Sequence, residues 1–123
     1  MSELSLKILV CGDRDWTNVQ RIREILATYS TDITIIEGEA RGADSIARDI
    51  STELGFTVVK CPADWSKYGR SAGPIRNIQM LDMKPDIVLA FHDDLERSKG
   101  TRHTVTEAMR RGIHVIVYTS QSE

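Results

Sequence analysis

The sequence predicts an α/β fold: a single Rossmann-like domain with a five-stranded parallel sheet and helices on both of its faces. Short apolar runs alternate with segments whose apolar residues recur every three to four positions. No long linker, repeat or low-complexity tract interrupts this alternation, and 123 residues suit one domain. Strands that alternate with helices favour a parallel sheet joined by right-handed crossovers. We expect one domain over residues 1–123, with its core over 6–118.

The first half of the chain predicts two strand–helix units. Residues 6–12, LKILVCG, form a short apolar run that ends in glycine, which is typical of a buried parallel strand. A helical stripe of apolar residues follows within 17–29. The second strand is expected at 32–38, DITIIEG, and the second helix at 43–54, where Gly55 follows as a C-terminal cap.

The third strand is expected at 56–62, FTVVKCP. It ends at its final proline, which cannot continue the hydrogen-bond ladder of a sheet. Residues 63–73 read as a polar loop. A helix over 74–81 follows, since Pro74 suits the first helical position. Its apolar stripe consists of Ile75, Ile78 and Leu81.

The last strand–helix–strand unit begins with DIVLAF at 86–91, followed by a polar loop that runs to Gly100. A helix is expected over 101–111, with Met109 among its inward residues, and the glycine that follows ends it. IHVIVY at 113–118 is the fifth strand.

Composition narrows the class of protein. Hydrophobic residues make up 41% and charged residues 28%, which is ordinary for a globular domain, and the net charge of −2 argues against general nucleic-acid binding. No segment approaches the ~20 apolar residues of a membrane span, and no signal-peptide pattern opens the chain. We therefore expect a cytoplasmic protein with no membrane partner. Cys11 and Cys61 lie outside any metal-binding pattern and read as reduced thiols at strand ends, so neither a metal nor a cofactor is expected.

Unusual residues concentrate in the loops that leave strands. These loops are GDRDW, GEARGAD, PADWSKYGRSAGP and HDDLERSKGT, whereas the loops that enter strands are the plainer YSTD, ELG, MKPD and RRG. Turn chemistry enriches glycine and aspartate at both edges of a sheet, but it does not place Arg14, Arg41, Arg70 and Arg76 on one side. Open parallel sheets bind ligands beyond the carboxyl ends of their strands. The sequence therefore predicts a site for an anionic small molecule at this edge.

Free amides at helix N-termini, glycines that permit close approach and guanidinium groups all favour a phosphate-bearing ligand, and aromatic rings can stack on a base. The residues that we expect to contact the ligand are Gly12, Arg14, Trp16, Gly38, Arg41, Gly42, Ala43, Asp44, Trp65, Tyr68, Arg70, Gly73, Arg76, Asn77, Ser98, Gly100 and Thr101.

Several residues carry two interpretations. Trp16 stacks on a ligand or packs as a lid on the first helix. Asp44 contacts the ligand or caps its helix. His103 and Glu107, four positions apart, form an acid–base pair or an ordinary exposed contact. His92, followed by two aspartates, could ligate a metal, although adjacent polar residues in a loop more often face solvent.

Taken together, GDRDW, GEARGAD, PADW…YGR.AGPIRN..M and the glycine–threonine turn of the last helix resemble the SLOG superfamily. More narrowly they look like its YspA/cpYpsA-related branch of bacteria and their phages. The resemblance spans residues 6 to 118. It implies a Rossmann-like fold, a homo-oligomer, and the binding of a nucleotide or nucleotide-derived signal, ADP-ribose-like or a nucleoside phosphate, by a sensor, carrier or sequestering protein. By position, the matches are Gly38, Arg41, Gly42 and Asp44 in the first glycine-rich motif and Gly100 and Thr101 in the second.

The resemblance also implies an alternative, a hydrolase of an N-glycosidic bond in a nucleoside monophosphate or a related nucleotide. LOG-type phosphoribohydrolases of the superfamily use a glutamate soon after their glycine–threonine turn, together with an arginine. In this chain the candidates for catalysis are Glu107, Asp44 and Arg76. Two departures bear on this alternative. Glu39 stands where many relatives have a second glycine, and Glu107 lies six positions after Thr101, about two helical turns away instead of one.

Overall fold

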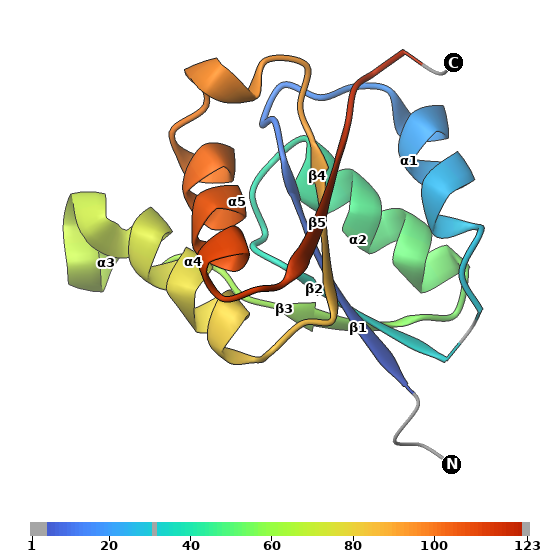
Figure 1. Cartoon of the computed structure of the whole chain (residues 1–123), viewed down its shortest axis with the longest axis horizontal. Coiled ribbons are helices and arrows are strands. Elements are labelled where there is room, and N and C mark those ends of the chain that lie inside the picture. The colour runs from blue at the N-terminus through green and yellow to red at the C-terminus, as the bar shows by residue number, and fades with distance from the viewer. Residues whose placement is uncertain (1–4, 31, 122–123) are drawn as a thin grey trace.

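The computed structural model describes residues 5–30 and 32–121 and contains one sheet of five parallel strands (Figure 1). The strands are β1 (Leu6–Gly12), β2 (Ile33–Glu37), β3 (Thr57–Lys60), β4 (Ile87–Phe91) and β5 (His114–Tyr118). The helices are α1 (Val19–Leu26), α2 (Ala43–Glu53), α3 (Trp65–Tyr68), α4 (Ala72–Asp82) and α5 (Gly100–Arg110), with short 3-10 turns η2 (Gly69–Ser71) and η3 (Leu95–Arg97). Residues 1–4 and 122–123 of the expected domain lie outside the described residues, so the domain bounds stay a prediction.

The strand order β3-β2-β1-β4-β5 places β1 at the centre of the sheet. Leu9 of β1 lies opposite Ile36 of β2 on one side and Val88 of β4 on the other. The chain builds outward from β1 to β3 and then crosses to β4, so the strand order reverses between β1 and β4. Such a reversal is the point at which open α/β sheets bind ligands. The predicted Rossmann-like α/β fold is confirmed.

Each face of the sheet is buried by a different pair of helices, α1 and α2 on one side and α4 and α5 on the other (Figure 1). Side chains alternate along a strand, so Ile8 and Val10 of β1 face the first pair whereas Leu9 and Cys11 face the second. All four are buried, and full burial stabilises an Ile, Leu or Val side chain by about 1.5–3 kcal/mol.

The segment after β3 differs from its prediction. Residues 63–73 were expected to form a polar loop, yet they include α3, η2 and the first two residues of α4. Helix α4 begins at Ala72, so Pro74 is its third residue rather than its first. The helix tolerates this position because the first turn has no intrahelical acceptor for an N–H there.

The buried faces of the last two helices also differ from their predicted stripes. In α4 the residues at 75 and 78 are only partly buried, while Arg76, Asn77 and Met80 are buried. In α5 Met109 is 64% exposed, and Thr104 is buried instead. Both helices therefore turn polar residues inward near the carboxyl ends of the strands.

Trp16 belongs to the core. Its side chain is 5% exposed, packs edge-on against Phe91 with ring centroids 5.6 Å apart, and donates a hydrogen bond from Nε1 to the carbonyl of Asn18 at 2.9 Å. The prediction that Trp16 stacks on a ligand is wrong, because the protein already contacts the ring. The alternative interpretation, a lid packed over the first helix, describes its position.

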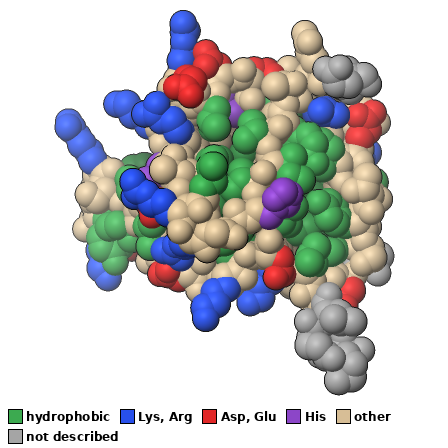
Figure 2. Space-filling view, in the orientation of Figure 1, with side chains coloured by type: hydrophobic (Ala, Val, Ile, Leu, Met, Phe, Trp, Pro, Cys, Tyr) green, Lys and Arg blue, Asp and Glu red, His purple; other side chains and the backbone are tan. Residues whose placement is uncertain are grey.

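The sheet ends in an exposed edge at β5, which pairs only with β4. Figure 2 shows hydrophobic side chains grouped around this edge, and Val117 is 43% exposed.

No helix within residues 5–30 and 32–121 is both long and apolar enough to span a membrane. The cytoplasmic location stays a prediction. So does the homo-oligomer, which the sedimentation coefficient of the purified chain would test.

The two tryptophans should respond differently to truncation. Trp16→Ala removes a buried ring and its hydrogen bond, so we expect the free energy of unfolding to fall by about 3–5 kcal/mol. Trp65 is 51% exposed, and Trp65→Ala should change stability by no more than about 0.5 kcal/mol. Urea unfolding of both variants measures the difference. Equal losses of stability would contradict the placement of Trp16 in the core.

Candidate functional site

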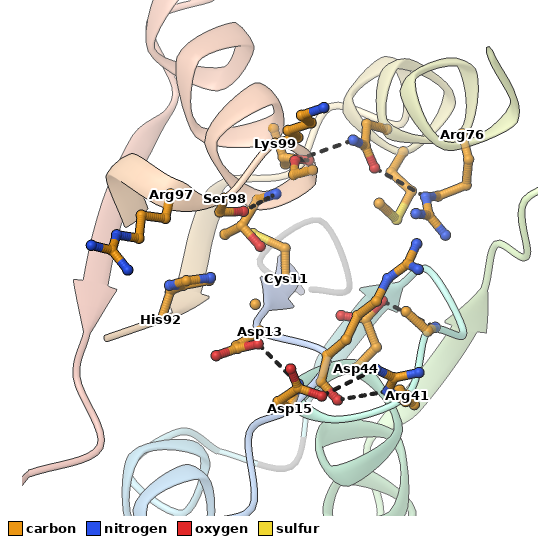
Figure 3. Close-up of a pocket in the computed structure, with 18 residues that line it drawn as sticks. Cys11, Asp13, Asp15, Arg41, Asp44, Arg76, His92, Arg97, Ser98 and Lys99 are labelled. Atoms are coloured by element: carbon orange, nitrogen blue, oxygen red, sulfur yellow. Dashed lines mark hydrogen bonds and ion pairs between the residues drawn. The ribbon is translucent and has the colours of Figure 1, made fainter. Parts of the chain in front are cut away.

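A cavity of about 460 Å³ opens at the carboxyl ends of β1 and β4, within the size range of small-molecule sites. Figure 3 shows it between the opening of α5, with Ser98 and Lys99, and a facing group of aspartates. The residues that line it are Cys11, Gly12, Asp13, Arg14, Asp15, Ala40, Arg41, Asp44, Arg76, Asn77, Met80, His92, Arg97, Ser98, Lys99, Gly100, Thr101 and Thr104.

Backbone hydrogen bonds fix the three loops that form this cavity. The amide of Asp13, just after β1, donates to the carbonyl of Phe91 at the end of β4 at 2.8 Å. The carbonyl of Asp13 accepts a hydrogen bond from the amide of Ala43 at the start of α2, at 3.0 Å. The loop after β1 is therefore held to both neighbouring loops.

Arg76 is a buried cation in the wall of the cavity, with 9% of its surface exposed. Its Nη1 donates to the carbonyl of Gly38, and its Nε donates to Oδ1 of Asn77 at 3.0 Å. Both acceptors are neutral, and among the described residues no carboxylate oxygen lies within 4.0 Å of the guanidinium nitrogens. Burial lowers the pKa of Arg76, although the nearby Asp44 charge opposes this. Nothing in the described protein neutralises this guanidinium by direct contact.

Gly38 makes room for Arg76. A Cβ atom at this position would lie 2.5 Å from Nη1 of Arg76 and 2.8 Å from its Cζ. Both belong to the guanidinium, which is itself held by the Gly38 carbonyl, so it cannot withdraw without losing that bond. Glycine is therefore needed here to admit the arginine, not to admit a ligand.

Asp44 accepts hydrogen bonds from backbone amides that we had expected to bind a phosphate. Its Oδ2 accepts hydrogen bonds from the amides of Gly38 at 3.1 Å and Ala40 at 3.3 Å. Burial raises the pKa of Asp44 to about 6, while these two amides and the charge of Arg76 act in the opposite direction. Asp44 is not the helix cap either, since α2 has Gly42 as its N-cap with no side-chain hydrogen bond.

Glu37 and Glu39 also form hydrogen bonds that hold the loop after β2. Glu37 is fully buried, and its Oε1 accepts the amide of Glu39 at 2.7 Å. The pKa of Glu37 is raised to about 8, mainly by burial, and the neighbouring Glu39 side chain contributes in the same direction. Among the described residues, Oε2 of Glu37 has no hydrogen-bond partner. Glu39 in turn pairs with Arg48 at 3.2 Å and has a left-handed backbone with φ 58°.

The opening of α5 remains available to an anion. The amide of Thr101 donates to Oγ of Ser98 at 2.9 Å, which caps one position of the first turn. Within the part of the chain that the structure describes, the amides of Gly100 and Arg102 have no hydrogen-bond acceptor. Unpaired amides at a helix N-terminus carry partial positive charge that attracts anions.

His92 lines the cavity with a defined tautomer. The amide of Asp94 donates to its Nδ1 at 2.9 Å, so a neutral ring carries its proton on Nε2. The carboxylate of Asp93 accepts the amide of Ser120 at 2.7 Å. These bonds oppose the interpretation of this stretch as a metal site. Across residues 5–30 and 32–121, no three His, Cys, Asp or Glu side chains gather in a way that could hold a metal ion.

The structure brings together about half of the residues expected to contact a ligand. Those that line the cavity are Gly12, Arg14, Arg41, Asp44, Arg76, Asn77, Ser98, Gly100 and Thr101. They come from four separate segments of the chain, as the prediction of a shared carboxyl edge requires.

Other expected contacts lie elsewhere, which corrects their predictions. Gly38 and Ala43 are buried by protein, and a Cβ at Gly42 would collide with the backbone of Arg14, so these residues pack the loops together. Arg70 is exposed on η2 and does not line the cavity.

The two aromatic residues of the segment after β3, Trp65 and Tyr68, differ in their relation to the cavities. The ring of Tyr68 lies under the ammonium group of Lys67, 5.1 Å from its nitrogen, and lines neither this cavity nor the one next to it. Gly73 is buried, and a Cβ there would lie 3.5 Å from the ring of Trp65. Trp65 itself borders a second cavity, of about 470 Å³, next to the first.

Glu107 does not belong to the site. It pairs with Arg110 at 2.8 Å on the surface of α5 and does not line the cavity, so the structure does not bring it together with the other predicted catalytic residues, Asp44 and Arg76. His103 does not line the cavity itself, but its Nδ1 lies 3.2 Å from Nδ2 of Asn77, which does. His103 and Glu107 bond to different partners, so the structure shows neither the acid–base pair nor the direct contact that the two interpretations offered.

Sequence reasoning missed several residues of the cavity wall. Asp13 and Asp15 lie in GDRDW, and Arg97 and Lys99 lie in HDDLERSKGT, so the rule that located those loops could have included them. Thr104 lies one helical turn after Gly100 and Thr101 in α5. To predict Thr104, one must know which face of α5 points into the cavity, and the spacing of apolar residues did not reveal that face.

Comparisons with known proteins agree with this fold. Residues 6–68 match the sequence profile of the family described as YspA, cpYpsA-related SLOG. The Gene 61 protein of Mycobacterium phage D29 is 37% identical over 119 residues, covering 89% of this chain and 94% of the phage protein. DNA processing protein A (DprA) from Streptococcus pneumoniae shares the fold, with a TM-score of 0.74 and 15% identity over 91% of this chain. The match covers 50% of that DprA chain, so this chain spans about half its length.

The buried acid Glu37 should give stability a measurable pH dependence. Its pKa rises on folding from 4.5 to about 8, so the folded state holds a proton that the unfolded chain releases between these values. The free energy of unfolding should therefore fall as pH rises through this window. Asp44, whose pKa rises from 3.8 to about 6, contributes in the same direction at lower pH.

Glu37→Gln should flatten this dependence between pH 6.5 and 8.5, because the amide keeps an acceptor for the Glu39 amide without an ionisable proton. Urea unfolding at several pH values measures it, with the exposed Glu53→Gln as a matched control. Wild-type stability that stays level or rises over this range would contradict a buried neutral Glu37.

Proposed function

The chain belongs to the YspA, cpYpsA-related SLOG family, and from this premise we propose that it binds a nucleotide or nucleotide-derived signal through its phosphate. The protein then acts as a sensor, carrier or sequestering protein for that small molecule. The ligand occupies the cavity at the carboxyl ends of β1 and β4, with its phosphate against Arg76 and the opening of α5.

The observation that carries this proposal is the buried and unpaired guanidinium of Arg76. Burial of a charge without an opposite charge is unfavourable, so buried arginines in proteins are normally paired. The guanidinium has two neutral acceptors and lines a cavity large enough for a small molecule. An anion supplied by a ligand completes the ion pair, and guanidinium matches phosphate with parallel hydrogen bonds.

The charges around the cavity favour a ligand with two kinds of polar group. Lys99 and the amides of Gly100 and Arg102 lie at the opening of α5, which suits phosphate oxygens. Across the cavity, Asp13 and Asp15 present carboxylates, which accept hydrogen bonds from hydroxyl groups such as those of a ribose (Figure 3). A phosphorylated sugar has both kinds of group: its phosphate would bind the opening of α5, and its hydroxyl groups would bind the carboxylates of Asp13 and Asp15.

Arg76→Met should separate binding from stability. The substitution removes the unpaired cation but keeps an apolar chain of similar length, so we expect stability to fall by no more than about 1 kcal/mol. Loss of charge-assisted hydrogen bonds should weaken ADP-ribose or pyrophosphate binding by about 10- to 100-fold, measured by titration calorimetry.

Arg70→Met is the matched control, because Arg70 is exposed and does not line the cavity. It should leave the dissociation constant within about twofold of the wild type. Equal losses of affinity in both variants, or none in Arg76→Met, would show that the proposed phosphate site is misplaced.

An N-glycosidic hydrolase is the second candidate, and the position of Asp44 favours it. This carboxyl is buried in the cavity wall with its pKa raised to about 6, and perturbed acids often mark catalytic sites. Ionised Asp44 would stabilise the positive charge that develops on the sugar as the bond to the base breaks. Water then adds to the sugar carbon, and the base leaves with a proton.

Mass spectrometry separates the two candidates. The protein is incubated with nucleoside monophosphates and ADP-ribose, and the mixture is analysed for free base. Hydrolysis predicts base release that Asp44→Asn abolishes, since the amide keeps an acceptor for the loop amides but carries no charge. Recovery of intact nucleotide alone, with a measurable dissociation constant, would rule out hydrolysis of these substrates and favour binding.

A further inference from the structure

The second cavity adjoins the first and shares part of its wall. Arg14, Ala40, Arg41 and Arg76 line both cavities, so the two are neighbouring lobes of one site. The lobes have similar volumes, about 460 and 470 Å³. Arg76, which has no carboxylate partner among the described residues, therefore stands at the boundary between them.

Trp65 gives the second lobe a different chemistry from the first. Its ring is 51% exposed, although an indole of this size is normally largely buried. One edge of the ring lies over Gly73, where a Cβ would come within 3.5 Å, and the ring forms part of the cavity wall beside Pro62 and Ala63. This part of the wall is apolar and aromatic, and three arginines, Arg14, Arg41 and Arg76, together with Glu39 line the rest of the lobe.

An exposed aromatic ring beside guanidinium groups is suited to a nucleotide. Base–aromatic stacking tolerates any base because every base has a π face, and the neighbouring arginines hold the phosphate. Trp16 offers no such surface, because the core covers it. The first lobe is lined mainly by charged and hydroxyl side chains, which suit a sugar and phosphates instead of a base.

We propose that the second lobe is the base subsite of a ligand that spans both lobes, with its base on Trp65 and its phosphates between Arg14 and Arg76. The first lobe holds a further sugar beyond the phosphates. The inference rests on the proposed function and narrows its ligand to a nucleoside diphosphate that carries a second sugar. A nucleoside monophosphate fills only one lobe and binds more weakly.

Fluorescence tests the base subsite directly, because the chain contains only two tryptophans and one of them is buried. ADP-ribose should change the emission of the wild type, and this change should be absent in Trp65→Phe, where only Trp16 emits. Pyrophosphate, which has no ring, should bind without changing the emission through stacking.

Affinities complete the test. Trp65→Ala should weaken ADP-ribose binding by about tenfold and leave pyrophosphate binding within about twofold. Wild-type protein should bind ADP-ribose more tightly than AMP. Thermal unfolding of the variant without ligand should match the wild type, which separates a binding defect from misfolding.

The outcomes distinguish the two proposals. If pyrophosphate and ADP-ribose bind with an Arg76-dependent affinity but Trp65→Ala changes neither, the base subsite is overturned and the phosphate site stands. If AMP binds as tightly as ADP-ribose, the two-lobed ligand is overturned. If none of the three probes binds at millimolar concentration, the proposed function fails together with the inference.

Discussion

The site is organised around one unbalanced charge, the guanidinium of Arg76. Helix α4 buries this side chain against the end of β2, and the two acceptors that it finds there, the Gly38 carbonyl and the Asn77 side chain, carry no charge. The loop after β2 has no side chain at 38 because the guanidinium needs that space. Arg76 lines both lobes of the cavity, so a phosphate between them would offset the charge.

The buried acids explain why the protein itself does not neutralise Arg76. Asp44 is the nearest candidate, but its carboxylate accepts two amides of the loop and its pKa is raised to about 6. The pKa of Glu37 is raised to about 8, and its carboxyl accepts a hydrogen bond from the amide of Glu39. Both carboxyls position the loop backbone, and both make the fold less stable at neutral pH than neutral side chains would. Such perturbed groups at one edge of the sheet are typical of functional sites rather than of scaffold.

Much of the fold was predictable because apolar periodicity reports burial directly. Residues 8–11 of the strand LKILVCG are buried, and β1 has the predicted bounds. The segment after β3 was not predictable in this way. In α4 the apolar residues Ile75 and Ile78 are only partly buried, whereas Arg76 and Asn77 point inward, because the helix is oriented by the polar site and not only by the core.

The site was predictable only as a location. The rule that ligands bind at the carboxyl edge selected loops that do line the cavity, including those of Arg14, Arg41 and Ser98. The direction in which a loop residue points follows from tertiary packing, so the same rule also selected Trp16, which is buried, and Arg70, which faces away. Likewise, the family resemblance and the helical spacing from His103 made Glu107 a catalytic candidate, whereas its ion pair with Arg110 lies outside the cavity.

A crystal structure of the protein with pyrophosphate tests the central claim most directly. The account predicts electron density for the anion at the boundary of the two lobes, with an oxygen about 3 Å from a guanidinium nitrogen of Arg76. Density confined to exposed arginines such as Arg70, with ordered water against Arg76, would contradict it.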